Sequence, residues 1–179
     1  MTVNGTLAPG QGVAAVGLLT VGAPDRAVTV NLSGASSRYL FELSATNAGS
    51  LAALNDGSST TAVGAGNNYL RVRSDVGVGS SLSFSPTTVG VVSTPGLVNF
   101  DNSKFYSWQV ADLADGSLTA GAPAFDTSTF NNATGGGTFS LSVVGQSLFL
   151  NFTPVPEPAT VLLVAGLGLG AVRLRRRLA

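Results

Sequence analysis

Apolar and polar residues alternate one by one along several stretches of this chain, and this pattern constrains the fold more than any other feature. Successive side chains of a β-strand point to opposite faces, so strict alternation predicts strands that are buried on one face. No stretch before residue 159 shows convincing helical periodicity. The sequence therefore predicts an all-β body over residues 1–153. The alternating stretches are 27–32, 38–44, 69–73, 81–85, 106–110, 138–143 and 147–152.

The last two of these stretches are separated by Gly145 and Gln146 alone. A two-residue connection with Gly in first place suits a type II′ turn, so residues 138–152 are expected to form an antiparallel hairpin. Such a hairpin would end the body and cover its edge. The side chains expected to point inward are Phe139, Leu141, Val143, Leu148, Leu150 and Phe152.

Composition excludes several classes of function. The chain has no Cys and no His, which excludes disulfides, zinc sites built from these residues and catalytic triads that need imidazole. Charged residues make up 10% of the chain, against about 25% in ordinary domains. Four of the nine basic residues lie in the last seven positions, which leaves an acidic body. An acidic body argues against nucleic-acid binding, which requires a basic face.

The C-terminal tail has three parts. Three Pro within residues 154–158 predict an exposed, extended linker. Residues 159–174 contain a single charge, Arg173, and predict a short hydrophobic transmembrane helix, although a spanning helix usually needs about 20 residues. Residues 175–179 form a basic end, which should stay in the cytoplasm and leave residues 1–158 on the far side of the membrane. The apolar anchor residues are Val161, Leu162, Leu163, Val164, Leu167, Leu169 and Val172, and the basic cluster is Arg173, Arg175, Arg176 and Arg177.

The alternative for this tail is a buried core helix with a solvated basic end. A core helix should be amphipathic, whereas this stretch is apolar on every face. The order of the three parts favours the anchor.

The tail resembles the PEP-CTERM sorting signal of exported bacterial proteins. The resemblance rests on Val155, Pro156, Glu157 and Pro158, followed by the apolar stretch and the Arg cluster at the extreme C-terminus. It implies recognition by an exosortase, a membrane protease-transpeptidase, with processing near Pro156–Pro158 and a transient anchor in the inner membrane. Proteins with this signal are typically surface or extracellular-matrix proteins of Gram-negative bacteria, often of species that make exopolysaccharide.

Proteins with such a tail also carry an N-terminal secretion signal. In this chain the first basic residue is Arg26, and Gly17 breaks the apolar patch at residues 13–19. We read no signal peptide here. The expectation is that the natural start lies upstream of Met1.

The body carries a second resemblance. Residues 4–10 and 17–22, together with residues 105–110 and 139–154, resemble the ends of autotransporter-type β-helix repeat proteins. This resemblance implies a short right-handed parallel β-solenoid closed by the hairpin. The alternative is a self-contained antiparallel β-sandwich, and the alternation of residues is compatible with both.

Candidate chemistry in the body is sparse. Most of its carboxylates accompany Gly, Asn or Ser, where Asp commonly caps its own backbone. Asp112, Asp115 and Asp126 would bind Ca²⁺ only if a loop brought them together, so no metal or cofactor is predicted. Tyr106 and Trp108 are candidates for a sugar-stacking platform, although both alternate as core residues would.

The sequence thus predicts an exported structural protein of the surface or matrix, without catalysis of its own. The first alternative is an exopolysaccharide-binding or adhesion module that uses Tyr106 and Trp108. The second is a glycan-active enzyme that uses a pair of carboxylates.

Overall fold

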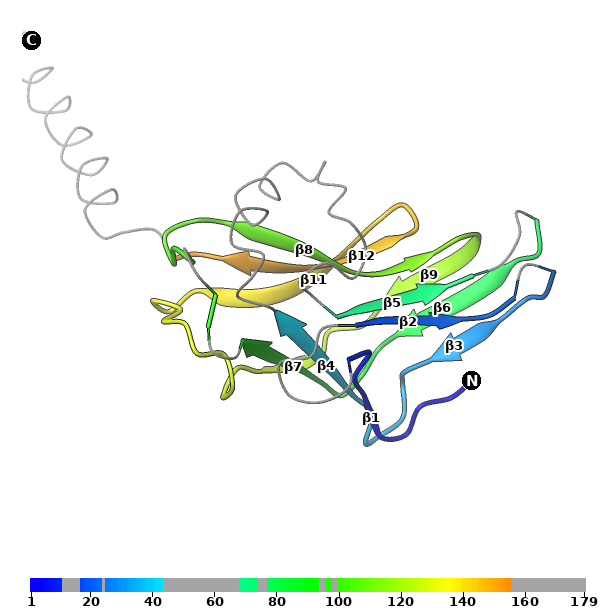
Figure 1. The fold of residues 1–179 in the computed structure, drawn as a ribbon, viewed down its shortest axis with the longest axis horizontal. Helices are drawn as coiled ribbons and strands as arrows, with labels where there is room; N and C mark the ends of the chain where they lie inside the picture. Colours follow the sequence, from blue (N-terminus) through cyan, green and yellow to red (C-terminus); the bar gives the residue numbers. More distant parts are fainter. Residues whose placement is uncertain are drawn as a thin grey trace, which may run out of the picture.

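The computed structural model describes residues 1–10, 17–23, 25–43, 68–73, 77–93, 96–97 and 100–155, and these residues form an all-β body (Figure 1). No helix occurs among them, and the helix expected at 159–174 lies outside them. Twelve strands make up the body. They are β1 (Thr6–Leu7), β2 (Leu18–Val21), β3 (Thr29–Asn31), β4 (Arg38–Leu43), β5 (Tyr69–Val72), β6 (Ser80–Phe84), β7 (Thr88–Ser93), β8 (Tyr106–Leu113), β9 (Gly116–Ala120), β10 (Ala124–Asp126), β11 (Thr138–Val144) and β12 (Ser147–Thr153).

Each strand from β1 to β7 pairs in parallel with the strand three places later in the chain. This rule produces three sheets, which contain β1-β4-β7-β10, β2-β5-β8 and β3-β6-β9. The chain therefore passes through the three sheets in turn, as β1–β3, β4–β6 and β7–β9. β10 then adds a fourth strand to the first sheet. The alternative of an antiparallel sandwich is wrong, because the pairings among these ten strands are parallel.

The parallel register places apolar side chains of successive passes directly beside one another. Because the period of side-chain direction is two, a slip of one residue would turn each of these side chains away from the core. Inward columns of in-register residues run across all three sheets. They are Leu7-Tyr39-Val89-Phe125, Leu19-Leu70-Ala111 and Val30-Leu82-Leu118.

The predicted antiparallel hairpin is confirmed. β11 pairs with β12 from Thr138↔Thr153 to Val144↔Ser147, and Gly145 adopts a φ of 59° in the connection. β12 also pairs antiparallel with β8, so the hairpin extends the second sheet to five strands. Val143 lies on the same face as its buried partner Leu148, but it is 40% exposed because it sits on the outer strand of the sheet. Of the other residues predicted to point inward, Leu148, Leu150 and Phe152 on β12 are fully buried, Phe139 on β11 is buried, and Leu141 on β11 is partly buried.

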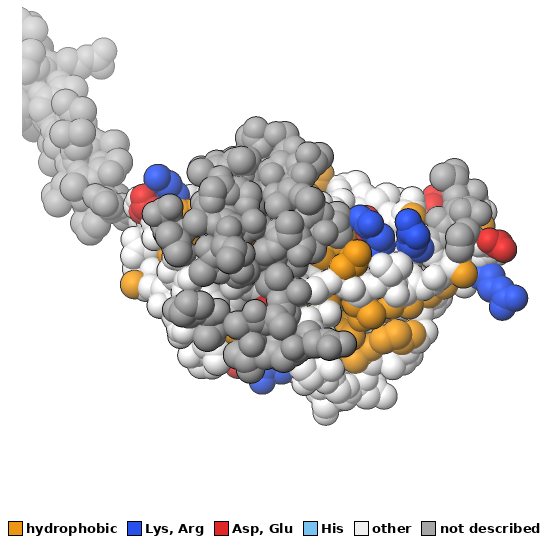
Figure 2. Space-filling model, in the orientation of Figure 1, with side chains coloured by type: hydrophobic (Ala, Val, Ile, Leu, Met, Phe, Trp, Pro, Cys, Tyr) orange, Lys and Arg blue, Asp and Glu red, His pale blue; other side chains and the backbone are white. Residues whose placement is uncertain are grey.

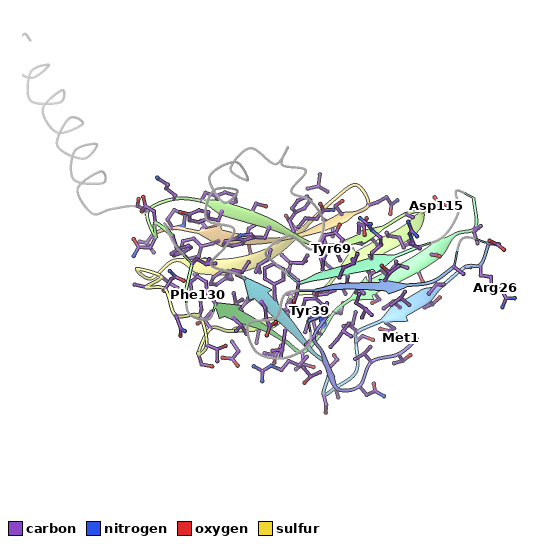
Figure 3. The ribbon with its side chains drawn as sticks, viewed as in Figure 1. Met1, Arg26, Tyr39, Tyr69, Asp115 and Phe130 are labelled. Carbon is purple, nitrogen blue, oxygen red and sulfur yellow. The ribbon has the colours of Figure 1, made fainter. Side chains whose placement is uncertain are left out.

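The core lies between the sheets and includes side chains from every complete pass of the chain. Figure 3 shows Tyr39 in the interior, where its ring lies 4.9 Å from that of Phe84, centroid to centroid. Burial raises the pKa of the Tyr39 hydroxyl, which stays neutral. A second group of rings gathers between the hairpin, β8, β10 and the segments that carry Phe100 and Phe130. This aromatic cluster consists of Phe100, Tyr106, Trp108, Phe125, Phe130, Phe139 and Phe152.

Candidate functional site at the C-terminal exit of the body

The body ends at Thr153, the last residue of β12, and the chain leaves it through Pro154 and Val155. Pro154 has no N–H to donate to a neighbouring strand, so the ladder stops where the proline-rich linker begins. Val155 is 53% exposed. The first residue of the predicted sorting motif is therefore accessible at the surface of the body.

β12 holds this exit firmly, because it lies between two hydrogen-bonded neighbours, β8 and β11. The ring of Phe152, two residues before Pro154, is fully buried and lies 5.2 Å from each of the rings of Phe100 and Phe139. Gly137 makes room for it, since a Cβ at this position would overlap the Phe152 ring. The tail is thus attached to one of the best-packed strands of the body.

A turn beside the aromatic cluster, just before β8, carries the charged residues Asp101 and Lys104. The backbone N–H and the hydroxyl of Ser103 both donate to Asp101, at 3.0 and 2.7 Å, and lower the pKa of its carboxyl group; Lys104 adds to this effect. The backbone N–H of Asp101 donates to the hydroxyl of Tyr106 at 2.8 Å. This turn is structural, because its carboxylate is bonded to its own loop.

The remaining residues of the predicted site lie outside the residues that the structure describes. None of the described residues forms a helix long and apolar enough to cross a membrane. The residues outside are Pro156, Glu157 and Pro158 of the motif, the anchor residues Val161, Leu162, Leu163, Val164, Leu167, Leu169 and Val172, and the basic cluster of Arg173, Arg175, Arg176 and Arg177.

The predicted glycan platform is not at the surface. Tyr106 and Trp108 are 3% and 2% exposed, and their rings stack on each other at 5.6 Å within the aromatic cluster. A sugar cannot stack on a ring whose faces are already covered by protein. The prediction that these two residues contact glycan is therefore wrong, and their alternation with polar neighbours reflects core packing.

The structure separates the three carboxylates that were considered for Ca²⁺. Asp112 on β8 accepts from Arg71 on the neighbouring strand β5. Asp126 on β10 accepts from Arg38 on β4, and both of these strands belong to a different sheet from β8. Asp115 accepts from the backbone N–H of Gly77. In the described part of the chain, no group of three metal-ligating side chains is present.

Sequence reasoning missed two features of the body. Arg38 reaches across β7 to Asp126 at 2.5 Å, and Gly90 of β7 leaves the space through which its guanidinium passes. Asn68 is buried where two passes of the chain meet, and its amide oxygen accepts from the backbone N–H of Gly17 at 3.0 Å. Neither could be found from local alternation, because both depend on which passes become neighbours.

No curated protein and no solved structure matches this chain. Residues 154–177 match the family model of the PEP-CTERM protein-sorting motif, which begins one residue after β12 ends. This motif implies export, passage through the membrane and processing by an exosortase. It covers the tail alone, so the sorting tail is the part of the chain for which a family is identified.

Proposed function

We propose that this chain is an exported structural protein of the bacterial surface or extracellular matrix, sorted through its tail and without catalysis of its own. The observation that carries the proposal is the sorting motif at residues 154–177, placed directly after an exposed exit from the body. The three prolines of residues 154–158 favour an extended segment that cannot continue the strand ladder, which suits binding by a membrane protease.

We further propose that the body is a short β-solenoid with three strands in each turn, closed by the hairpin. Support comes from the pairing of each strand with the one three places later and from the in-register apolar columns. Stacked turns bury a continuous core although each turn alone is too small to do so. The right-handed form is the one that parallel crossover connections favour.

Ion pairing of the acidic side chains supports a role without catalysis. A catalytic carboxylate pair needs two groups that face each other across a site. Asp112 and Asp126 instead face arginines, Arg71 and Arg38, on neighbouring strands. With Tyr106 and Trp108 in the core, binding of exopolysaccharide has no described residue in its favour.

The experiment that tests sorting changes Glu157 and Pro158 together to Ala in the full chain, preceded by a secretion signal. In a Gram-negative host with an exosortase, we expect the unchanged chain to lose its tail and leave the inner membrane. The variant should keep its tail and remain in the membrane fraction. Mass spectrometry of both fractions measures the two outcomes.

A matched control is Thr160→Ser, which alters the same tail outside Val155–Pro158 and should be processed like the unchanged chain. The same three chains in a host that lacks the exosortase should all remain in the membrane. The proposal fails if Glu157→Ala with Pro158→Ala changes neither the size nor the location of the protein.

A further inference from the structure

The end of the body from which the tail leaves is formed by three short segments that the strand register brings together (Figure 1). Phe152 near the end of β12 pairs with Tyr106 at the start of β8, and Thr153 pairs with Thr138 at the start of β11. These segments, here called the exit face, are residues 100–105, 134–137 and 153–155. The exit face is thus the part of the body closest to the segment that follows in the chain.

The exit face carries the one exposed aromatic side chain among the described residues. Phe105 is 42% exposed, because the alternation that turns Tyr106 into the core turns its neighbour outward. Val155 on the same face is 53% exposed. One row further along the sheet the outward side chains are polar, and Ser107 donates to Asn151 at 2.7 Å. At this end of the sheet, the outward apolar surface therefore belongs to the exit face.

The exit face has little charge, and its two charged groups form a pair. One carboxylate oxygen of Asp101 accepts from Ser103 in its own turn, and the other lies 3.4 Å from the Nζ atom of Lys104. Figure 2 shows basic and acidic side chains at this end of the body. The side chain of Lys104 is 61% exposed and directly precedes Phe105. An apolar ring beside an ammonium group suits the boundary between lipid headgroups and acyl chains.

The linker is too short to hold the exit face far from a membrane. Five residues, 154–158, separate the end of β12 from the apolar stretch that begins at Ala159. An extended chain advances at most about 3.3–3.6 Å per residue, so Thr153 lies within about 20 Å of the start of that stretch. This step rests on the proposed function, in which the apolar stretch is the membrane anchor before processing. A surface tethered so closely meets lipid at a high effective concentration, which favours even a weak contact.

We propose that the exit face lies on the lipid surface before processing, with Phe105 and Val155 at the boundary of the acyl chains and Lys104 among the phosphates. The partner is a lipid bilayer because the chain that continues from this face carries the anchor, which makes lipid the nearest apolar surface. The contact holds the linker at the surface where a membrane protease acts. Two side chains are too few for lasting attachment, so the body is released once the tail is removed.

The test uses the full chain in vesicles of phosphatidylethanolamine and phosphatidylglycerol, with no other protein present. The chain has no Cys, so a single introduced Cys carries a fluorescent label at one defined position. Asn102→Cys labels the exit face, and Gln146→Cys labels the exposed turn at the opposite end of β12. Lipids with a nitroxide near the headgroup quench a label that touches the bilayer. We expect quenching at position 102 to be several-fold stronger than at position 146.

The decisive comparison uses Phe105→Ser. This variant should reduce the quenching at position 102 to the level at position 146, whereas Phe105→Leu keeps an apolar side chain and should retain the quenching. The matched control is Val144→Ser, which removes an apolar side chain that is 65% exposed at the far end of β11 and should leave the quenching unchanged. The emission of the buried Trp108 verifies that every variant is folded.

Flotation of the vesicles distinguishes a failure of this inference from a failure of the proposed function. If the unchanged chain does not float with the vesicles, the tail is no anchor and both proposals fall. If it floats and the labels at positions 102 and 146 are quenched equally, the anchor stands and the lipid contact is overturned in favour of a protein partner. Equal loss of quenching in Phe105→Ser and Val144→Ser also overturns the contact, because the effect would not depend on the exit face.

Discussion

In the proposed solenoid, the first turn, formed by β1, β2 and β3, differs in strand length and in packing from the closing end, formed by β8 and the hairpin. β1, β2 and β3 have two, four and three residues, and Val30 is the one buried residue among them. β8, β12 and β11 have eight, seven and seven residues and enclose the aromatic cluster. A turn in a stack is stabilised by its neighbours alone, and the first turn has one described neighbour where the middle turn has two.

This difference indicates that stability is unequal along the stack. Local opening should begin at the first turn, which buries the least apolar surface. The hairpin covers the aromatic cluster and contains the strand from which the tail leaves. A pulling force on the tail would therefore act on the most stable part of the body.

The largest effect is expected for Phe152→Ala, which should lower the free energy of unfolding by about 3–5 kcal/mol because it empties the centre of the aromatic cluster. Denaturant unfolding followed by the fluorescence of the single Trp108, itself in the cluster, measures this loss. Leu19→Ala in the partly buried β2 should cost about 1 kcal/mol. Equal losses from the two substitutions would contradict the proposed inequality of the ends.

Gly116→Ala and Gly22→Ala form the next test, because each glycine has a positive φ, 122° and 111°, close to a neighbouring pass of the chain. A Cβ would overlap the carbonyl oxygen of Ser80 and of Arg73, respectively. We expect Gly116→Ala to cost about 2–3 kcal/mol and Gly22→Ala about 1 kcal/mol, because the first turn can shift outward.

The control for this pair is Gly77→Ala. Gly77 has a φ of 88° and no atom within 4 Å of a built Cβ, so it isolates the cost of the backbone conformation. If Gly22→Ala costs as much as Gly116→Ala in thermal unfolding, the first turn is as rigid as the last.

A smaller effect is expected for the ion pair between Arg71 and Asp112, whose atoms lie 3.2 Å apart. The register aligns Thr20, Arg71 and Asp112, so this pair joins the second and third turns and not the first. Arg71→Met should cost about 0.5–1 kcal/mol in the free energy of unfolding, because both groups are partly exposed. Most of this cost should disappear in 1 M salt, which a denaturation series at about 0.05 and 1 M NaCl measures.

The smallest effect concerns pH. The hydroxyl and backbone N–H of Ser128 lower the pKa of the Asp126 carboxyl below 3.8, and Arg38 adds to this effect. A carboxylate with a lowered pKa in the folded state stabilises it above the unfolded pKa and loses this contribution as pH falls through the folded pKa. Asp126→Asn should therefore lower the unfolding midpoint at pH 7 and leave it nearly unchanged at pH 2. A lower midpoint at both pH values would assign the effect to packing.

Local alternation located seven of the twelve strands and missed β1, β2, β7, β9 and β10, of which β7 is the most deeply buried. Thr88–Ser93 is buried along nearly its whole length, and a strand covered on both faces has no polar residues to alternate with. Alternation also could not distinguish Tyr106 and Trp108 as core from a surface platform, because an aromatic strand face has the same pattern in both settings. Val143 was placed inward by the same rule and is exposed because β11 has no described outer neighbour.

The sequence by itself determined the all-β character of the body, the closing hairpin and the sorting tail. Each of these depends on residues close together in the chain: the period of side-chain direction, a glycine in a two-residue turn, and a motif followed by apolar and basic residues. Only the tertiary structure decided which strands pair, that they run in parallel, and where Arg38 finds Asp126. Strand pairing joins residues dozens of positions apart, and a strand with one apolar face can satisfy it with either a parallel or an antiparallel neighbour.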